Sequence, residues 1–167
     1  EEHIAPAPRV SVQAFCETVE TAAAVQSAGE DRRLDKAHLK IQMGGMTAAI
    51  EAYRTAPTPN VILLETEGRN DILSALDQLA TVCDAGTRVI VIGRVNDVVL
   101  YRELVRRGIP FLFATGYGDG SMIPERFASR PIVRKPYEAA SIVSAATNAA
   151  GASARRRTTV PSRTTVA

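Results

Sequence analysis

Three side chains of different chemistry follow apolar runs in this sequence. Glu65 follows "NVILL", Thr115 follows "PFLFA" and Lys135 follows "PIVR". A carboxylate, a hydroxyl and an amine can bind a small ligand when they converge, and each can equally be an ordinary polar group at the end of a strand. Which of these holds depends on whether the three runs are strands of one sheet.

Strand-like and helix-like segments alternate along the chain. Helical spacing of apolar residues is found at 19–28 and 71–83. Repeated strand–helix units of this length predict an α/β fold with a parallel sheet and helices on both faces. Open parallel sheets place their sites at the carboxyl ends of the strands, where Glu65, Thr115 and Lys135 stand. The predicted strands are residues 9–16, 37–43, 61–65, 88–93, 110–116 and 131–135.

Length and charge bound the classes of function. With 167 residues and 46% hydrophobic content, the chain is long enough for one domain with a sizeable core. Four arginines lie in residues 151–167, which contain no acid, and subtracting them from the net charge of +2 leaves residues 1–150 at −2. The body is therefore not a basic nucleic-acid surface, and no specific nucleic-acid partner is expected. The two Gly-rich phosphate-loop motifs, G-x-G-x-x-G and G-x-x-x-x-G-K-[ST], do not occur in the sequence. Binding of dinucleotides or of P-loop nucleotides is therefore not indicated.

We expect three parts, namely a disordered N-terminus at residues 1–8, a folded domain at 9–150 and a disordered basic tail at 151–167. No apolar run approaches the ~20 residues of a membrane helix, so no membrane insertion is expected. The chain starts without methionine, which leaves open a further domain outside it.

Cysteine and histidine usage also favours a protein without a metal centre. Cys16 and Cys83 lie far apart in apolar segments and are expected to be reduced thiols in a cytoplasmic protein. His3 and His38 are isolated, which disfavours a histidine-based metal site or catalytic triad.

Three motifs resemble a response-regulator receiver domain of the CheY-like, flavodoxin-like class. "PTPNVILLETEG" is similar to the third strand that ends in the phosphoacceptor aspartate, and "FATGYGD" and "IVRKPY" resemble the two downstream signatures. The resemblance places Glu65 at the acceptor position and Thr115 at the switch hydroxyl. It places Lys135 at the phosphate-binding lysine and Pro136 at the proline that follows.

The resemblance has two sources. Residues 9–109 resemble the atypical N-terminal receiver of CpaE/TadZ pilus-assembly proteins, and residues 104–140 resemble the C-terminal third of a stand-alone receiver. The family has five strands whereas this chain offers six, because residues 88–93 and 110–116 are both similar to the fourth. If 88–93 lies beside 61–65, Thr115 and Lys135 move one strand outward, by about 4.8 Å.

The resemblance also implies a chemistry that this chain lacks the residues to perform. Receiver phosphorylation uses an aspartate nucleophile and a Mg²⁺ held partly by an acidic pair after the first strand. Here Gln13, Ala14 and Phe15 fill that region, and Glu17 is the only carboxylate nearby. We therefore expect no cofactor, no catalysis, and a degenerate receiver that acts as a protein-interaction module in signalling or in pilus or secretion-system assembly. The alternative is a phosphorylatable receiver with Mg²⁺ and a histidine kinase as partner.

Two hypotheses about Glu65 remain open at this point. Its carboxylate reaches one methylene farther than that of aspartate, so it can pair with Lys135 as a permanent substitute for a phosphorylated acceptor. It can equally be a solvated acid at the end of a strand.

The last predicted helix suggests a mode of association. Receivers commonly pair through their final helices and strands, and this helix carries a face of small and apolar residues. These are Ala139, Ile142, Val143 and Ala146. The sequence therefore predicts a homodimer that uses this face.

Overall fold

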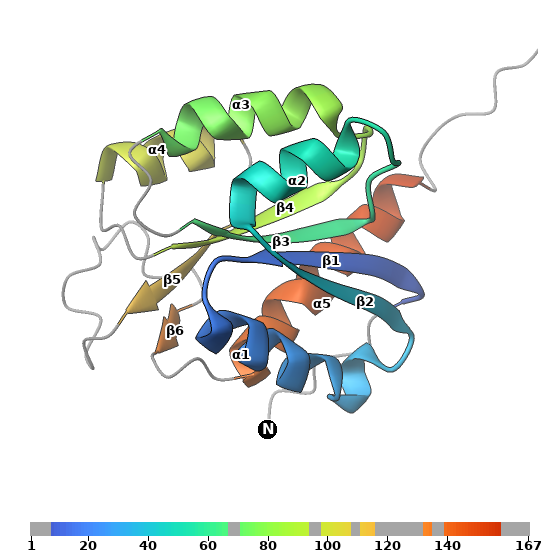
Figure 1. Cartoon of the computed structure of the whole chain (residues 1–167). Helices are drawn as coiled ribbons and strands as arrows, with labels where there is room; N and C mark the ends of the chain where they lie inside the picture. Colours follow the sequence, from blue (N-terminus) through green and yellow to red (C-terminus); the bar gives the residue numbers. More distant parts are fainter. Residues whose placement is uncertain are drawn as a thin grey trace, which may run out of the picture.

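The computed structural model describes residues 8–66, 71–93, 98–107, 111–115, 132–134 and 139–157. Six parallel strands form one sheet in the order β2-β1-β3-β4-β5-β6 (Figure 1). The strands are β1 (Val10–Cys16), β2 (Ala37–Met43), β3 (Val61–Thr66), β4 (Arg88–Gly93), β5 (Phe111–Thr115) and β6 (Ile132–Arg134). This arrangement confirms the predicted α/β fold.

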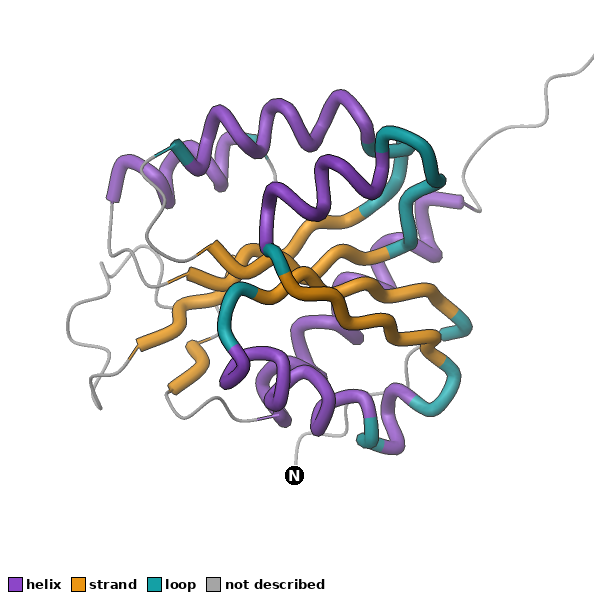
Figure 2. Tube along the Cα trace, viewed as in Figure 1, coloured by secondary structure: helices purple, strands orange, loops and turns teal. Residues whose placement is uncertain are grey.

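Helices cover both faces of the sheet. α2, α3 and α4 lie on one face, and α1 and α5 lie on the other (Figures 1 and 2). The helices are α1 (Val19–Gly29), α2 (Gly45–Tyr53), α3 (Ile72–Val82), α4 (Val98–Arg106) and α5 (Ala139–Arg157), with one 3-10 turn at Arg32–Leu34. Two helical layers around a parallel sheet are what right-handed crossovers produce.

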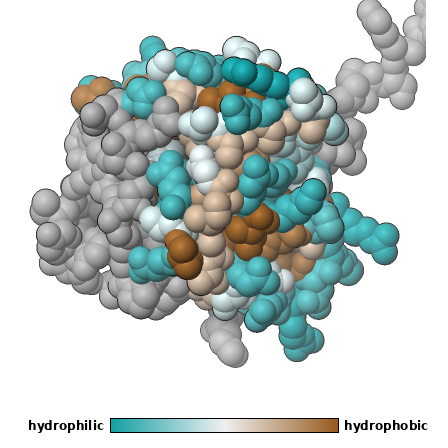
Figure 3. All heavy atoms as spheres, viewed as in Figure 1, coloured by the Kyte–Doolittle hydropathy of each residue, from teal (hydrophilic) through white to brown (hydrophobic). Residues whose placement is uncertain are grey.

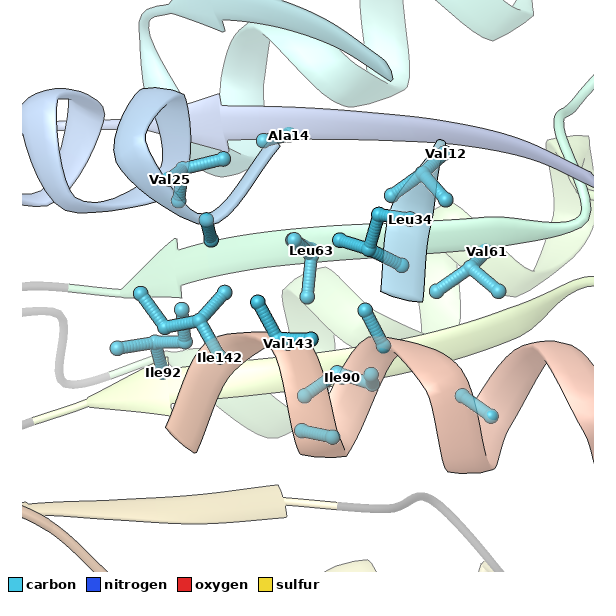
Figure 4. Close-up of a cluster of buried hydrophobic side chains, with 14 of the residues drawn as sticks. Val12, Ala14, Val25, Leu34, Val61, Leu63, Ile90, Ile92, Ile142 and Val143 are labelled. Carbon is cyan, nitrogen blue, oxygen red and sulfur yellow. The ribbon is translucent and has the colours of Figure 1, made fainter. Parts of the chain in front are cut away.

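β3 lies at the centre of the core. All six of its residues are buried, as its continuous apolar run predicted for a strand covered on both faces. Successive side chains alternate between the faces, so that Leu63 packs in the cluster beneath α1 and α5, and Leu64 packs in the cluster beneath α2 and α3. Figure 4 shows the first of these clusters, with Leu63 between strands β1 and β4 and helix α5.

The short connection from β2 to α2 depends on two glycines. Gly44 has φ 110° and Gly45 has φ 53°, values in the left-handed region that side-chain-bearing residues rarely adopt. A β-carbon at Gly44 would lie 2.8 Å from that of Ala48. The strand therefore turns directly into the helix, and α2 begins at the carboxyl edge of the sheet.

The sheet order decides which segment occupies the family's fourth position. β4 pairs with β3 along its whole length, from Val61 opposite Arg88 to Thr66 opposite Gly93. β5 pairs with the far side of β4, and β6 pairs with β5. Residues 88–93 thus lie beside β3, and Thr115, the last residue of β5, lies two strands away from it. Lys135 and Pro136 are outside the described residues.

The last helix is longer than predicted, and its apolar face is buried in the core. α5 continues through the boundary expected at residue 150 and ends at Arg157, so residues 151–157 are helical. Ile142, Val143 and Ala146 are 2%, 0% and 1% exposed and belong to the core beneath the sheet. The face that the sequence assigned to a homodimer is therefore filled by the chain's own strands.

Both cysteines are free, with Cys16 buried and Cys83 half-buried, as expected of reduced thiols.

None of the helices in the described part of the chain has the length and apolar character needed to cross a membrane.

Candidate functional site at the carboxyl edge of the sheet

Glu65 is a buried acid whose side chain points toward α1. Its position two residues after Leu63 puts it on the face of the sheet that α1 and α5 cover. β1 is the neighbouring strand, with Phe15 opposite Leu64, so the turn after β1 lies next to the Glu65 side chain. Only 3% of Glu65 is exposed, and the hypothesis of a solvated strand-end charge is therefore wrong.

Four donors from the start of α1 surround the Glu65 carboxylate. The backbone N–H groups of Glu17 and Thr18 donate to Oε2 at 2.7 and 3.0 Å. The hydroxyls of Thr18 and Thr21 donate to Oε1 at 2.9 and 2.7 Å. An ionised carboxylate offers about four lone-pair sites. Residues 17–21 therefore fill the hydrogen-bonding capacity of this side chain.

The two threonines serve the helix as well as the acid. Thr18 is the N-cap of α1, with extended backbone angles, and its Oγ1 accepts the N–H of Thr21 at 3.2 Å. Thr21 is 1% exposed, so its hydroxyl has exchanged water for the Glu65 oxygen. The N-terminus of a helix also carries a partial positive charge that favours an anion. Glu65 therefore clamps the end of β3 to the beginning of α1, and we call this group of Glu65, Thr18 and Thr21 the carboxylate clamp.

The thiol of Cys16 borders the clamp. Cys16 is the last residue of β1 and is 1% exposed. Burial raises the pKa of Cys16 to about 11, and the nearby charge of Glu65 adds to the increase. Only the thiolate is a nucleophile, so Cys16 is a neutral packing residue at neutral pH.

The region where the family places its acidic pair has another use in this chain. Gln13 accepts a hydrogen bond from the Tyr53 hydroxyl at 2.9 Å, and burial raises the pKa of Tyr53 above its usual value. Ala14 and Phe15 are fully buried in the two core clusters. These residues tie β1 to its neighbours by packing and one neutral hydrogen bond, and none of them supplies a carboxylate for a cation.

A Mg²⁺ ion does not fit the residues at this edge. Mg²⁺ demands oxygen ligands in near-octahedral geometry, whereas both oxygens of Glu65 face N–H and O–H donors and the positive end of α1. Glu17 lies in the turn after β1, as predicted, and its side chain occupies the space where a β-carbon of Gly45 would stand. Within the described ranges, His, Cys, Asp and Glu side chains form no group of three or more that could hold a metal ion.

The sequence-predicted site residues fall on different strands. Glu65 is opposite Ile92 on β4, and Ile92 is opposite Leu112 on β5. Thr115 therefore lies two strands across the sheet, about 10 Å at 4.8 Å per strand, and three residues farther along. β6 ends at Arg134, a third strand away from β3. The pairing of Glu65 with Lys135 is not tested, because Lys135 is outside the described residues.

Sequence interpretation missed Thr18 and Thr21. The available signal was a threonine immediately before an apolar-periodic segment, which is typical of an N-cap. That signal predicts where α1 begins, but it does not say which acid lies above the cap. Residues 44 to 48 positions apart in the chain form these contacts.

The clamp leads to a prediction about energetic coupling. In a double-mutant cycle measured by urea denaturation, Glu65→Gln and Thr21→Val are expected to show a coupling of about 1 kcal/mol or more, because the two groups share a buried hydrogen bond. Glu65→Gln and Lys135→Met are expected to add within about 0.5 kcal/mol, since the carboxylate's acceptor sites are already filled. If the Glu65 and Thr21 substitutions were additive and the Glu65 and Lys135 substitutions were coupled, the partner of Glu65 would be Lys135 and not Thr21.

Several solved structures are similar to this chain in fold. The chain is similar to the pilus assembly protein CpaE of Caulobacter crescentus CB15, with 33% identity over 87% of this chain and 97% of that chain and a TM-score of 0.69. The CpaE2 pilus assembly protein of Sinorhizobium meliloti 1021 is 31% identical, with coverage of 84% and 99% and a TM-score of 0.66.

A response regulator receiver protein of Sinorhizobium medicae WSM419 has the same fold at 13% identity, with coverage of 86% and 96% and a TM-score of 0.53. No protein-family model matches the sequence, and no curated protein does so either. The solved structures therefore support a receiver-like module, and the first two carry the sequence similarity.

Proposed function

Because the chain belongs to the family of CpaE pilus assembly proteins, we propose that it is a degenerate receiver that acts as a protein-interaction module in the assembly or positioning of a pilus. The observation that carries this proposal is the carboxylate clamp. The acid at the acceptor position is buried and bound by four donors, so it acts as a structural group and not as a nucleophile.

The clamp gives the module one fixed state. In a phosphorylated receiver, a change of charge at the acceptor selects between two arrangements of the domain. Here the acid is part of the chain itself, and its partners are residues 17–21 at the start of α1, which packs on β1, β2 and α5. Binding surfaces on these elements are therefore present without a kinase, and we place the protein in the cytoplasm with components of the pilus machinery as its partners.

Acetyl phosphate with Mg²⁺ provides the direct test. Intact-mass spectrometry is expected to show no adduct of about 80 Da on the wild-type chain, because receiver phosphorylation needs an accessible nucleophile and a bound metal. A stable adduct would favour the alternative, a phosphorylatable receiver in a two-component phosphorelay, and would overturn the proposal.

A matched variant separates the loss of the aspartate nucleophile from the loss of the metal ligands. Glu65→Asp restores the acceptor residue type and leaves Gln13, Ala14 and Phe15 in the region of the acidic pair. We expect this variant to remain unmodified as well, since Mg²⁺ still lacks its ligands. Modification of Glu65→Asp alone would show that the residues of this edge hold a metal and that only the nucleophile has been lost.

A further inference from the structure

The outer strand β2 exposes an edge that is separate from the carboxylate clamp. It is the last strand of the sheet, pairing with β1 on one side, and no other described strand pairs with it on the outer side. An edge strand presents a row of backbone N–H and C=O groups that can pair with another extended chain. In Figure 1, β2 lies at the front of the molecule beside β1.

The two faces of β2 differ in chemistry. Leu39 and Ile41 point toward α1 and are only half-buried against the core. His38, Lys40 and Gln42 alternate with them, point to the opposite face and are exposed. Figure 3 shows brown apolar atoms on this side of the molecule with teal polar atoms around them. The edge is therefore apolar on one face and polar on the other, where Lys40 carries a positive charge.

A hollow of about 480 Å³ lies across the amino ends of β2 and its neighbour β1, between Lys36 and His38 on one side and Ser11 and Asn60 on the other. Its wall contains two permanent cations, Arg9 and Lys36, together with His38, against one acid, Asp35. Asn60 lies at the same end, where its Oδ1 accepts the N–H of Ser11 at 2.9 Å. Among the described residues, neither Arg9, Lys36 nor Lys40 forms an ion pair.

These charges decide between possible occupants of the edge. In an antiparallel pairing of two copies of β2, the residue opposite Lys40 is Lys36, His38, Lys40 or Gln42, depending on the register, because opposite residues share a face of the sheet. None of these is an acid, and two of them repeat the charge of Lys40. Like charges directly opposite one another destabilise a strand pair. A second copy of this chain is therefore a poor partner, and an extended segment that alternates acidic with apolar residues complements both faces.

We propose that the outer edge of β2 binds an extended, acidic segment of a partner protein as an added strand. The backbone of β2 supplies the pairing groups, the exposed Lys36 and Lys40 receive the acidic side chains, and Leu39 and Ile41 receive the apolar ones. This site lies on a different strand from Glu65, so it is independent of whether the acceptor position can be phosphorylated.

The test uses synthetic peptides as probes on the full chain. One peptide alternates glutamate with valine over about the 7 residues of β2, and its matched control alternates lysine with valine. The glutamate peptide is expected to bind and to slow hydrogen exchange at β2 amides, and Lys40→Glu is expected to weaken its binding tenfold or more. Arg102→Glu, which reverses an exposed cation on α4, is the control and should leave binding unchanged.

Three results would overturn the proposal. The first is equal binding of the glutamate and lysine peptides, which would mean that charge does not select the occupant. The second is binding without protection of β2 amides, which would indicate electrostatic adhesion to the surface and not strand addition. The third is no binding of the glutamate peptide at millimolar concentration.

Discussion

Replacement of Glu65 by glutamine is expected to lower the free energy of unfolding by about 3 kcal/mol. Glutamine keeps one carbonyl oxygen, but an NH₂ group replaces the second oxygen of the carboxylate. This NH₂ group would face N–H or O–H donors and cannot accept their hydrogen bonds. Each buried donor left without a partner costs about 1–3 kcal/mol, and hydrogen bonds to a charged group are stronger than neutral ones. Urea denaturation followed by circular dichroism measures the change.

Glu51→Gln is the matched control for this substitution. Glu51 is exposed on α2, so the same chemical change there is expected to stay within about 0.5 kcal/mol. In Glu65→Gln, hydrogen exchange should also become faster at the amides of Glu17 and Thr18, immediately before α1, since both donate to the Glu65 carboxylate. A variant as stable as the wild-type chain, with unchanged exchange at the amides of Glu17 and Thr18, would show that the carboxylate does not hold the beginning of α1 in place.

Replacement of Ile142 by alanine is expected to lower the free energy of unfolding by about 3 kcal/mol. Ile142 is 2% exposed and packs in the cluster that contains Leu63 and Ile92. Removing a buried side chain of this size costs about 2–5 kcal/mol, because apolar contacts are lost and a cavity remains. Chemical denaturation measures this loss, and sedimentation at several protein concentrations shows whether the oligomeric state changes with it.

This substitution separates a core role from the dimer face predicted from the sequence. Asn148→Ala, at an exposed position of the same helix, is the control and should change stability by no more than about 0.5 kcal/mol. If Ile142→Ala instead kept the stability of the monomer and abolished a dimer, the face would be intermolecular, contrary to its burial in this structure.

The local pattern of the sequence was sufficient for the elements and the fold class. The continuous apolar run of β3 predicted a strand covered on both faces, and all six of its residues are buried. The helical spacing at residues 19–28 predicted the first helix, and α1 extends over Val19–Gly29. These features depend on backbone geometry and on the burial of neighbouring side chains, which a short stretch of sequence encodes.

The order of the strands could not be decided in this way. Residues 88–93 and 110–116 were both similar to the fourth strand of a receiver, and each is apolar enough to lie beside β3. Only the pairing of β4 along the whole of β3 placed Thr115 two strands away. Strand order is set by the packing of the crossover helices on the sheet, which involves residues distant in the chain.

The sequence by itself determined that an acid stands at the end of a continuous apolar strand of an α/β protein, and its resemblance to receivers predicted that this acid occupies the phosphoacceptor position. The period of two also places Glu65 on the same face of β3 as Leu63, whereas the helices that cover this face are known only from the packing. Only the tertiary structure decided what that acid does. Its four donors belong to residues 17–21, which the sheet brings alongside β3, and a hydrogen bond depends on distances and angles that separate segments acquire only when they pack together.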